Sequence, residues 1–230
     1  MQERILERMK EKKTFGEKMR DILDKLGTIV LMNLMFLIAS LPIVTIGPAW
    51  SGLLTAVRYR IRGDKWMAGF KFGFKTRFWR SLLAWCVMLL PMYYFVTEIS
   101  FHWHYEQLVP LVAAAFVFAL LSMFLTAMQI LNVYVPTKPS VWLRNAMQLL
   151  KTGFFKVLGM ALVFWLPIFL FLMWPQVFML IILIFPAAYY ALSAYLTTMV
   201  LKDNLVDFLL EARAQGTLLA EESKPKSEDE

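Results

Sequence analysis

This sequence has few of the residues on which covalent cross-linking and catalysis most often depend. It contains one cysteine, Cys86, and two histidines among 230 residues, so a disulfide framework and a cysteine metal site are excluded. Gly-rich phosphate loops, dinucleotide fingerprints, zinc-helix motifs and nucleophile elbows are also absent. We therefore expect no enzyme, no catalytic residues and no cofactor.

The sequence is rich instead in long uncharged runs. Hydrophobic residues make up 59% of the chain and aromatic residues 15%, more than one soluble core needs. All 24 lysines and arginines fall in four blocks, at residues 4–25, 58–80, 138–156 and 202–226. Because lysine and arginine stay on the cytoplasmic side of a cell membrane during insertion, we expect all four blocks and both termini there. The pattern predicts an all-α, polytopic transmembrane helical bundle.

The net charge of +7 does not by itself indicate nucleic-acid binding. The cations flank apolar segments, so the anionic headgroups of the bilayer are their nearest partners. We expect membrane lipids, and no nucleic acid, as partners.

Charge and hydropathy divide the chain into three parts. Residues 1–25 predict a cytoplasmic amphipathic segment, residues 26–205 a single membrane domain, and residues 206–230 a disordered cytoplasmic tail. The domain is expected to form three helical hairpins with basic interfacial amphipathic helices. The expected spans are residues 26–46, 49–61, 81–97, 108–135, 154–174 and 177–201.

The first hairpin contains the most distinctive stretch, which is interrupted by Pro42, Thr45, Gly47 and Pro48. Two prolines and a glycine so close together break a helix. The uncharged segment after Pro48 is about 14 Å long if helical, half of a bilayer. Residues 49–61 are therefore expected to be short or re-entrant, with Arg58 extending toward the headgroups.

An internal repeat supports this count in hairpins. A shift of 76 residues superposes many apolar and basic positions of residues 66–95 on residues 142–171. The matches include Trp66 with Trp142, Lys75 with Lys151, Phe78 with Phe154, Arg80 with Lys156, and Pro91 with Pro167. Each copy predicts a basic interfacial helix followed by a span that contains a proline.

The turn between the third and fourth spans holds the chain's two histidines. It contains Glu98, His102, His104 and Glu106, side chains that can bind zinc or copper. An external turn needs polar residues in any case, and its aromatic neighbours suit the membrane interface. We favour the interfacial turn and expect no metal.

No ionisable side chain lies centrally in the expected spans, whereas ion-coupled transporters usually carry one there. Gln129 and Asn132 are separated by one helical turn, which makes them the best pair for a shared intramembrane polar spot. Interhelical hydrogen bonding is the default role of such residues, and a substrate path is the alternative.

Three stretches carry a resemblance to a known family: Asn33-Leu34-Met35-Phe36, Leu41 to Ala49, and Arg62-Gly63-Asp64. In them the chain resembles the YesL-like family of bacterial integral membrane proteins of unknown function. The resemblance implies a small multi-pass protein of the bacterial cytoplasmic membrane, associated with carbohydrate uptake and polysaccharide utilisation. It carries over no catalytic residue, and it implies only that the Pro42 to Pro48 hairpin is structurally or functionally important.

Three hypotheses of different classes follow. The first is an accessory or regulatory partner of a carbohydrate-uptake system, with sugar ABC transporter subunits as candidate partners. The second is a small-solute or sugar transporter or channel in its own right, in which homo-oligomers are possible. The third, a lipid- or glycan-modifying enzyme, would need the turn that contains His102 and His104 to act on an external substrate.

Overall fold

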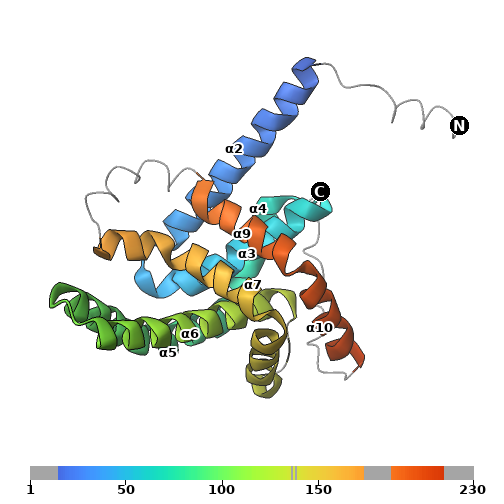
Figure 1. Ribbon diagram of the computed structural model, residues 1–230. Helices are drawn as coiled ribbons and strands as arrows, with labels where there is room; N and C mark the ends of the chain where they lie inside the picture. Colours follow the sequence, from blue (N-terminus) through green and yellow to red (C-terminus); the bar gives the residue numbers. More distant parts are fainter. Residues whose placement is uncertain (1–14, 136, 138, 174–187, 215–230) are drawn as a thin grey trace, which may run out of the picture.

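The computed structural model describes residues 15–135, 137, 139–173 and 188–214 (Figure 1). Its elements are helices, and the described residues contain no strand, so the predicted all-α class is confirmed. The elements are α2 (Phe15–Ala39), η1 (Ile43–Thr45), α3 (Ile46–Arg62), α4 (Trp66–Thr76), α5 (Phe78–His104), α6 (Leu108–Tyr134), α7 (Pro139–Met173), α9 (Tyr190–Val200) and α10 (Lys202–Ala214).

Three helices are long and apolar enough to cross a membrane, by length and composition: Phe78–His104, Leu108–Tyr134 and Val141–Pro167. They indicate a membrane protein. The third is not one straight rod, because Gly153 inside α7 has non-helical backbone angles (φ -127°, ψ 29°). The part of α7 after this break corresponds to the span expected at residues 154–174.

The first expected span begins earlier and ends earlier than the charge pattern suggests. α2 is continuous from Phe15, through the expected boundary at residue 26, and ends at Ala39. A turn and the short helix η1 then occupy residues 40–45, because Pro42 prevents α2 from continuing. Pro48, in contrast, lies in the first turn of α3, where a proline is tolerated. The expectation of a disordered tail from residue 206 is wrong for residues 206–214, which continue helix α10 with Phe208 buried. The rest of the expected tail and the first part of the expected span 177–201 lie outside the described residues.

The short second arm of this hairpin, α3, is the centre of the bundle. Eleven consecutive residues, 47–57, are buried, and α3 packs against α2, α4, α5, α6 and α9. It is bounded by Thr45 at its start and by Gly63 at its end, where a left-handed backbone (φ 87°) stops the helix. A segment too short to cross a bilayer alone is therefore stabilised by protein on its sides.

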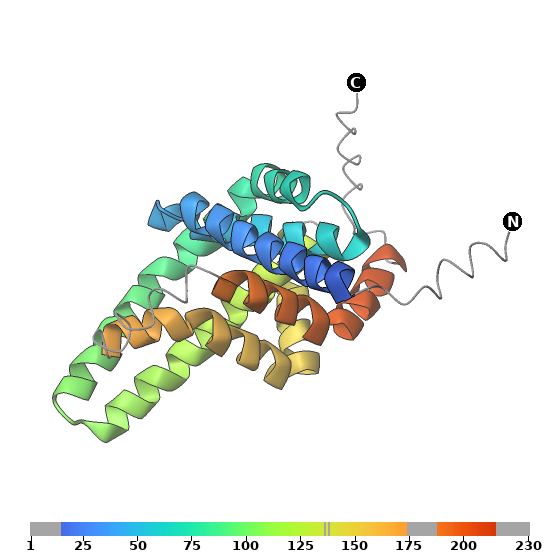
Figure 2. The same cartoon turned by 90° about the horizontal axis from the view of Figure 1, so that it is seen from above.

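The basic helix α4 and the helix α10 lie at one end of the bundle. α4 and α10 lie away from the α5–α6 turn in both views (Figures 1 and 2). The α5–α6 hairpin projects in the opposite direction, beyond the rest of the described structure (Figure 2). The ends of α3 and α6 and the start of α5 meet near α4, through side chains described below.

The predicted repeat is visible in the local structure. Arg77 separates α4 from α5 with non-helical angles (φ -105°, ψ 9°), and Gly153 breaks α7 in the same way. These two residues are also 76 positions apart. The aromatic pairs that follow the breaks match as well, edge to face with ring centroids 5.4 Å apart in both: Phe78–Trp79 and Phe154–Phe155.

Candidate functional site

Close contact between α3 and α4 depends on glycines that face polar residues. A Cβ atom built on Gly73 would lie 2.3 Å from Thr55 Oγ1 and 2.9 Å from the Ser51 carbonyl oxygen. One turn earlier, a Cβ on Gly69 would lie 2.7 Å from the ring of Tyr59. The Gly69-x-x-x-Gly73 spacing is a sequence signal for close helix packing in membranes, and it could have predicted this contact.

A closed set of hydrogen bonds joins α3, α5 and α6, and we call its members, Ser51, Ser81, Gln129 and Asn132, the serine–amide cluster. Asn132 Nδ2 donates to Ser81 Oγ (2.7 Å), and Ser51 Oγ donates to Gln129 Oε1 (3.2 Å). The two serine oxygens are 2.6 Å apart, so Ser81 is left to donate to Ser51. Gln129 Nε2 then donates to the Ser81 carbonyl (3.2 Å).

The cluster brings the predicted pair Gln129 and Asn132 together with two serines that sequence analysis did not select. All four side chains are buried, and a buried polar group is stable only when it is hydrogen-bonded. One atom is an exception, because Asn132 Oδ1 is buried without a hydrogen-bond partner. The predicted polar spot therefore has a structural role between three helices, while a role in a substrate path stays a prediction.

Gly47 links the predicted hairpin to this cluster. It lies in the first turn of α3, where a Cβ atom would be 2.7 Å from the Ser81 carbonyl oxygen and 3.2 Å from Gln129 Nε2. Pro48 is buried beside it. Two of the four hairpin residues thus belong to the contact between α3, α5 and α6.

The other two hairpin residues, Pro42 and Thr45, fix the preceding turn. Thr45 Oγ1 lies 2.7 Å from the Ala39 carbonyl oxygen and 2.7 Å from that of Pro42. Trp85 Nε1 donates to the Ile43 carbonyl (3.0 Å), which attaches the turn to α5. The structure does not bring Pro42 and Thr45 to the serine–amide cluster, and a ligand-binding role of the hairpin stays a prediction.

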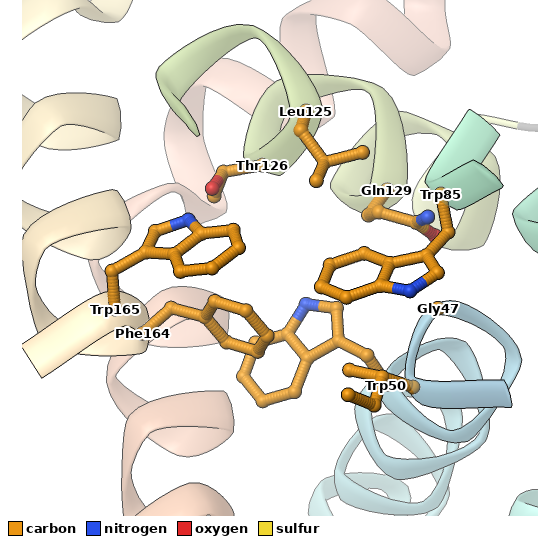
Figure 3. Close-up of a pocket in the computed structure, with 9 residues that line it drawn as sticks. Gly47, Trp50, Trp85, Leu125, Thr126, Gln129, Phe164 and Trp165 are labelled. Atoms are coloured by element: carbon orange, nitrogen blue, oxygen red, sulfur yellow. The ribbon is translucent and has the colours of Figure 1, made fainter. Parts of the chain in front are cut away.

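A small aromatic pocket adjoins the cluster, and we call it the tryptophan pocket (Figure 3). Its cavity volume is about 10 Å³, room for about one water molecule. Trp85 and Trp165 are nearly parallel, with ring centroids 5.9 Å apart. Its walls are Ile46, Gly47, Trp50, Trp85, Leu125, Thr126, Gln129, Phe164 and Trp165.

The pocket lies between the two copies of the repeat. Trp85 comes from the first copy, and Phe164 and Trp165 come from the second, while α3 and α6 supply the remaining walls. The indole Nε1 of Trp165 is buried without a hydrogen-bond partner, whereas that of Trp85 is bonded to Ile43. The pocket is uncharged and apolar, with one unmatched donor in its wall.

Three arginines of the second basic block contact the end of α6 and the residues that follow it. Arg77 donates to the Asn132 carbonyl, Arg58 to that of Val133 (3.4 Å), and Arg80 to that of Thr137 (2.5 Å). The carbonyls at a helix end lack intrahelical partners and carry partial negative charge, so guanidinium groups satisfy them well.

These contacts correct the expectation that Arg58 extends toward the headgroups. Its guanidinium lies over the ring of Tyr134, 5.7 Å from the centroid, and Arg80 lies over Trp142 at 5.5 Å. The two positions therefore combine a carbonyl contact with a cation–π contact. Arg58, Arg77 and Arg80 of the second basic block therefore make contacts inside the protein.

The two histidines near the α5–α6 turn do not form a ligand set in the structure. His102 Nε2 lies 3.1 Å from Glu98 Oε2, and His102 Nδ1 lies 2.8 Å from Gln107 Oε1. Within the described residues, no group of three or more histidine, cysteine, aspartate or glutamate side chains could hold a metal ion. Of the four residues Glu98, His102, His104 and Glu106, Glu98 and His102 are the two that contact each other.

Residues 29–99 match a family model described as "Protein of unknown function, DUF624". The match covers the end of α2, all of α3 and α4, and most of α5, so it includes the Pro42 to Pro48 hairpin and two members of the serine–amide cluster. No curated protein matches the chain, and no solved structure matches it. The comparisons therefore show similarity to a family without assigning an activity.

Proposed function

We propose that this chain is a non-enzymatic integral protein of the bacterial cell membrane that acts as an accessory or regulatory partner of a carbohydrate-uptake ABC transporter. The proposal includes an orientation with both termini in the cytoplasm. Its support is the YesL-like resemblance around Pro42 to Pro48, the family match over the same region, and three helices suited to a membrane.

One structural observation carries the proposal further, namely the exposed apolar tip of the first hairpin. Leu41 is 79% exposed, and Ile43 and Val44 are exposed beside it. The backbone under this tip is held by Thr45 and Trp85. An exposed apolar turn with a fixed backbone offers a contact surface to the helices of another membrane protein or to lipid, and the experiment below separates these two.

The test is photocrosslinking in native membranes with a photoreactive residue at Leu41, followed by mass spectrometry of the captured proteins. Thr45 is the matched control, because its hydroxyl is bonded inside the turn and its side chain is half-buried. We expect transporter subunits from Leu41 and far fewer from Thr45. Capture of lipid alone, or equal capture at both positions, contradicts an accessory role through this tip.

A second candidate function, transport of a small solute or sugar, has an observation of its own. The tryptophan pocket lies between the two copies of the repeat and beside the first turn of α3, which is where transporters built from repeats bind substrate. Proteoliposomes with a panel of sugars and oligosaccharides test this function. Flux of a sugar that Phe164→Ala in the pocket wall changes supports it, and absence of flux across the panel counts against it.

A further inference from the structure

Both copies of the repeat present the same outward stripe around their helix break. In each copy an exposed apolar residue lies on the basic helix, an exposed lysine follows near its end, and an exposed aromatic residue begins the long helix. We call these the break stripes. The first is Met67, Lys75 and Trp79, and the second is Leu143, Lys151 and Phe155, each 76 positions later.

The aromatic members are among the most exposed side chains of the described structure. Trp79 is 76% exposed and Phe155 is 84% exposed. Each is held by an edge-to-face contact with the phenylalanine before it, Phe78 or Phe154. An exposed ring at the end of a membrane helix, four residues after a lysine, is the pattern of a side-chain anchor at a membrane interface.

The helical segments that carry the lysines of the stripes contain positively charged side chains and no negatively charged ones. Neither α4 nor residues 139–156 contains an aspartate or a glutamate, while the exposed Lys71 and Arg144 add to the positive charge. Each stripe has one acidic residue in an adjoining segment. Asp64 lies three positions before Met67, and Asp203 precedes Asn204, whose Oδ1 lies 2.8 Å from Lys156 Nζ.

We propose that the two break stripes are equivalent binding sites for the headgroup of an anionic phospholipid. The ammonium group of Lys75 or Lys151 contacts the lipid phosphate, and the ring of Trp79 or Phe155 lies among the upper part of the acyl chains. Positive charge supplies the preference for an anionic lipid over a zwitterionic one. This inference does not depend on the proposed transporter partner.

The test uses the purified full-length chain in phosphatidylcholine vesicles that contain either brominated phosphatidylglycerol or brominated phosphatidylcholine. Bromine atoms quench nearby tryptophan, and the difference between the wild type and Trp79→Phe isolates the signal of the first stripe. We expect brominated phosphatidylglycerol to show about fivefold higher apparent affinity than brominated phosphatidylcholine. In the Trp79→Phe background, Phe155→Trp reports on the second stripe, where we expect a similar ratio.

Substitutions distinguish binding of the lipid at a stripe from general electrostatic attraction between anionic lipid and the basic surface. Lys75→Gln should lower the affinity ratio at Trp79 to near one, and Lys151→Gln should do the same for the second reporter. Lys202→Gln is the control, because it removes an exposed cation from α10, outside both stripes. Circular dichroism verifies that each variant is folded.

Three results would overturn the proposal. The first is equal quenching by the two brominated lipids. The second is an equal loss of preference in Lys202→Gln, which would show attraction to the whole basic surface. The third is loss of the preference when soluble glycerol phosphate is added, which would show a site for free phosphate rather than for a lipid.

Discussion

α3 differs from the outer half of α6, the half that begins at Leu108 beside the α5–α6 turn, in both composition and burial. α3 is the less apolar of the two and the more buried. α3 contains Gly47, Ser51, Gly52 and Thr55, yet all eleven residues from 47 to 57 are buried. The outer half of α6 is almost wholly apolar, yet Val109 is 80% exposed and Phe116 is exposed as well. Hydropathy therefore does not indicate which helix lies in the centre of this protein.

The physical reason is that lipid solvates apolar side chains as well as a protein interior does. Helices associate in a membrane through close packing and interhelical hydrogen bonds, and both favour small and weakly polar residues. The inner half of α6, which ends at Tyr134, follows this rule, because Gln129 and Asn132 lie there among buried residues. The following experiments test the contrast between small, polar contact surfaces and apolar, lipid-facing ones.

The largest effect is expected at the contact of α3 with α4. Gly73→Ala places a methyl group 2.3 Å from Thr55 Oγ1, and such overpacking costs about 3 kcal/mol of unfolding free energy. Gly159→Ala is the control, since nothing lies within 4 Å of its Cβ position. Alanine there should stabilise α7 slightly. Denaturant titration in micelles measures both, and equal midpoints would refute the packing argument.

A leucine pair compares the two halves of α6 directly. Leu131 is fully buried and Leu108 is exposed at the helix start. Leu131→Ala should cost about 2 kcal/mol, the low end of cavity costs, because lipid rather than water surrounds the bundle. Leu108→Ala should change the unfolding free energy by less than about 0.5 kcal/mol. Similar costs for the two would mean that the outer half of α6 is covered by protein.

The serine–amide cluster should have an intermediate effect. Gln129→Leu removes the bonds to Ser51 and to the Ser81 carbonyl, so a buried acceptor loses its donor at a cost of about 1 kcal/mol. Thr97→Val is the control, because the exposed Thr97 hydroxyl donates only to the Tyr94 carbonyl on its own helix. The same titration measures both, and no difference between them would show that the cluster does not join the helices.

The smallest expected effect is the difference in unfolding free energy between substitutions of the two pocket tryptophans, Trp85 and Trp165. Trp85→Phe deletes an indole donor that is bonded to Ile43, and Trp165→Phe deletes one without a partner. Both substitutions remove the same volume, so Trp85→Phe should be the more destabilising by somewhat less than 1 kcal/mol. Thermal unfolding midpoints measure the difference. A larger cost for Trp165→Phe would mean that its donor has a partner in solution.

The fold class, the helix break at Pro42 to Pro48 and the two-copy repeat could be predicted from the sequence. Each depends on local signals: long apolar runs, prolines, and matched positions 76 residues apart. The sequence was also sufficient to pair Gln129 with Asn132, which are separated by one turn of the same helix.

The partners of these residues could not be predicted in the same way. Ser51 and Ser81 are ordinary small polar residues in the sequence, and only packing brings them to within 2.6 Å of each other. Apolar periodicity does not distinguish a face that contacts lipid from one that contacts protein. The Gly69-x-x-x-Gly73 spacing was the one available signal for the position of α3 and α4, since it marks a close contact whatever the hydropathy.

The arginines at the end of α6 have a consequence for the order of assembly. Arg58, Arg77 and Arg80 precede α6 in the chain, so a ribosome completes them before the carbonyls of residues 132–137 exist. These three arginines are thus the donors that receive the end of α6 when it leaves the translocation machinery. The end of α6 docks in this sense onto partners that are already in place, and moving α6 ahead of them in the gene would reverse that order.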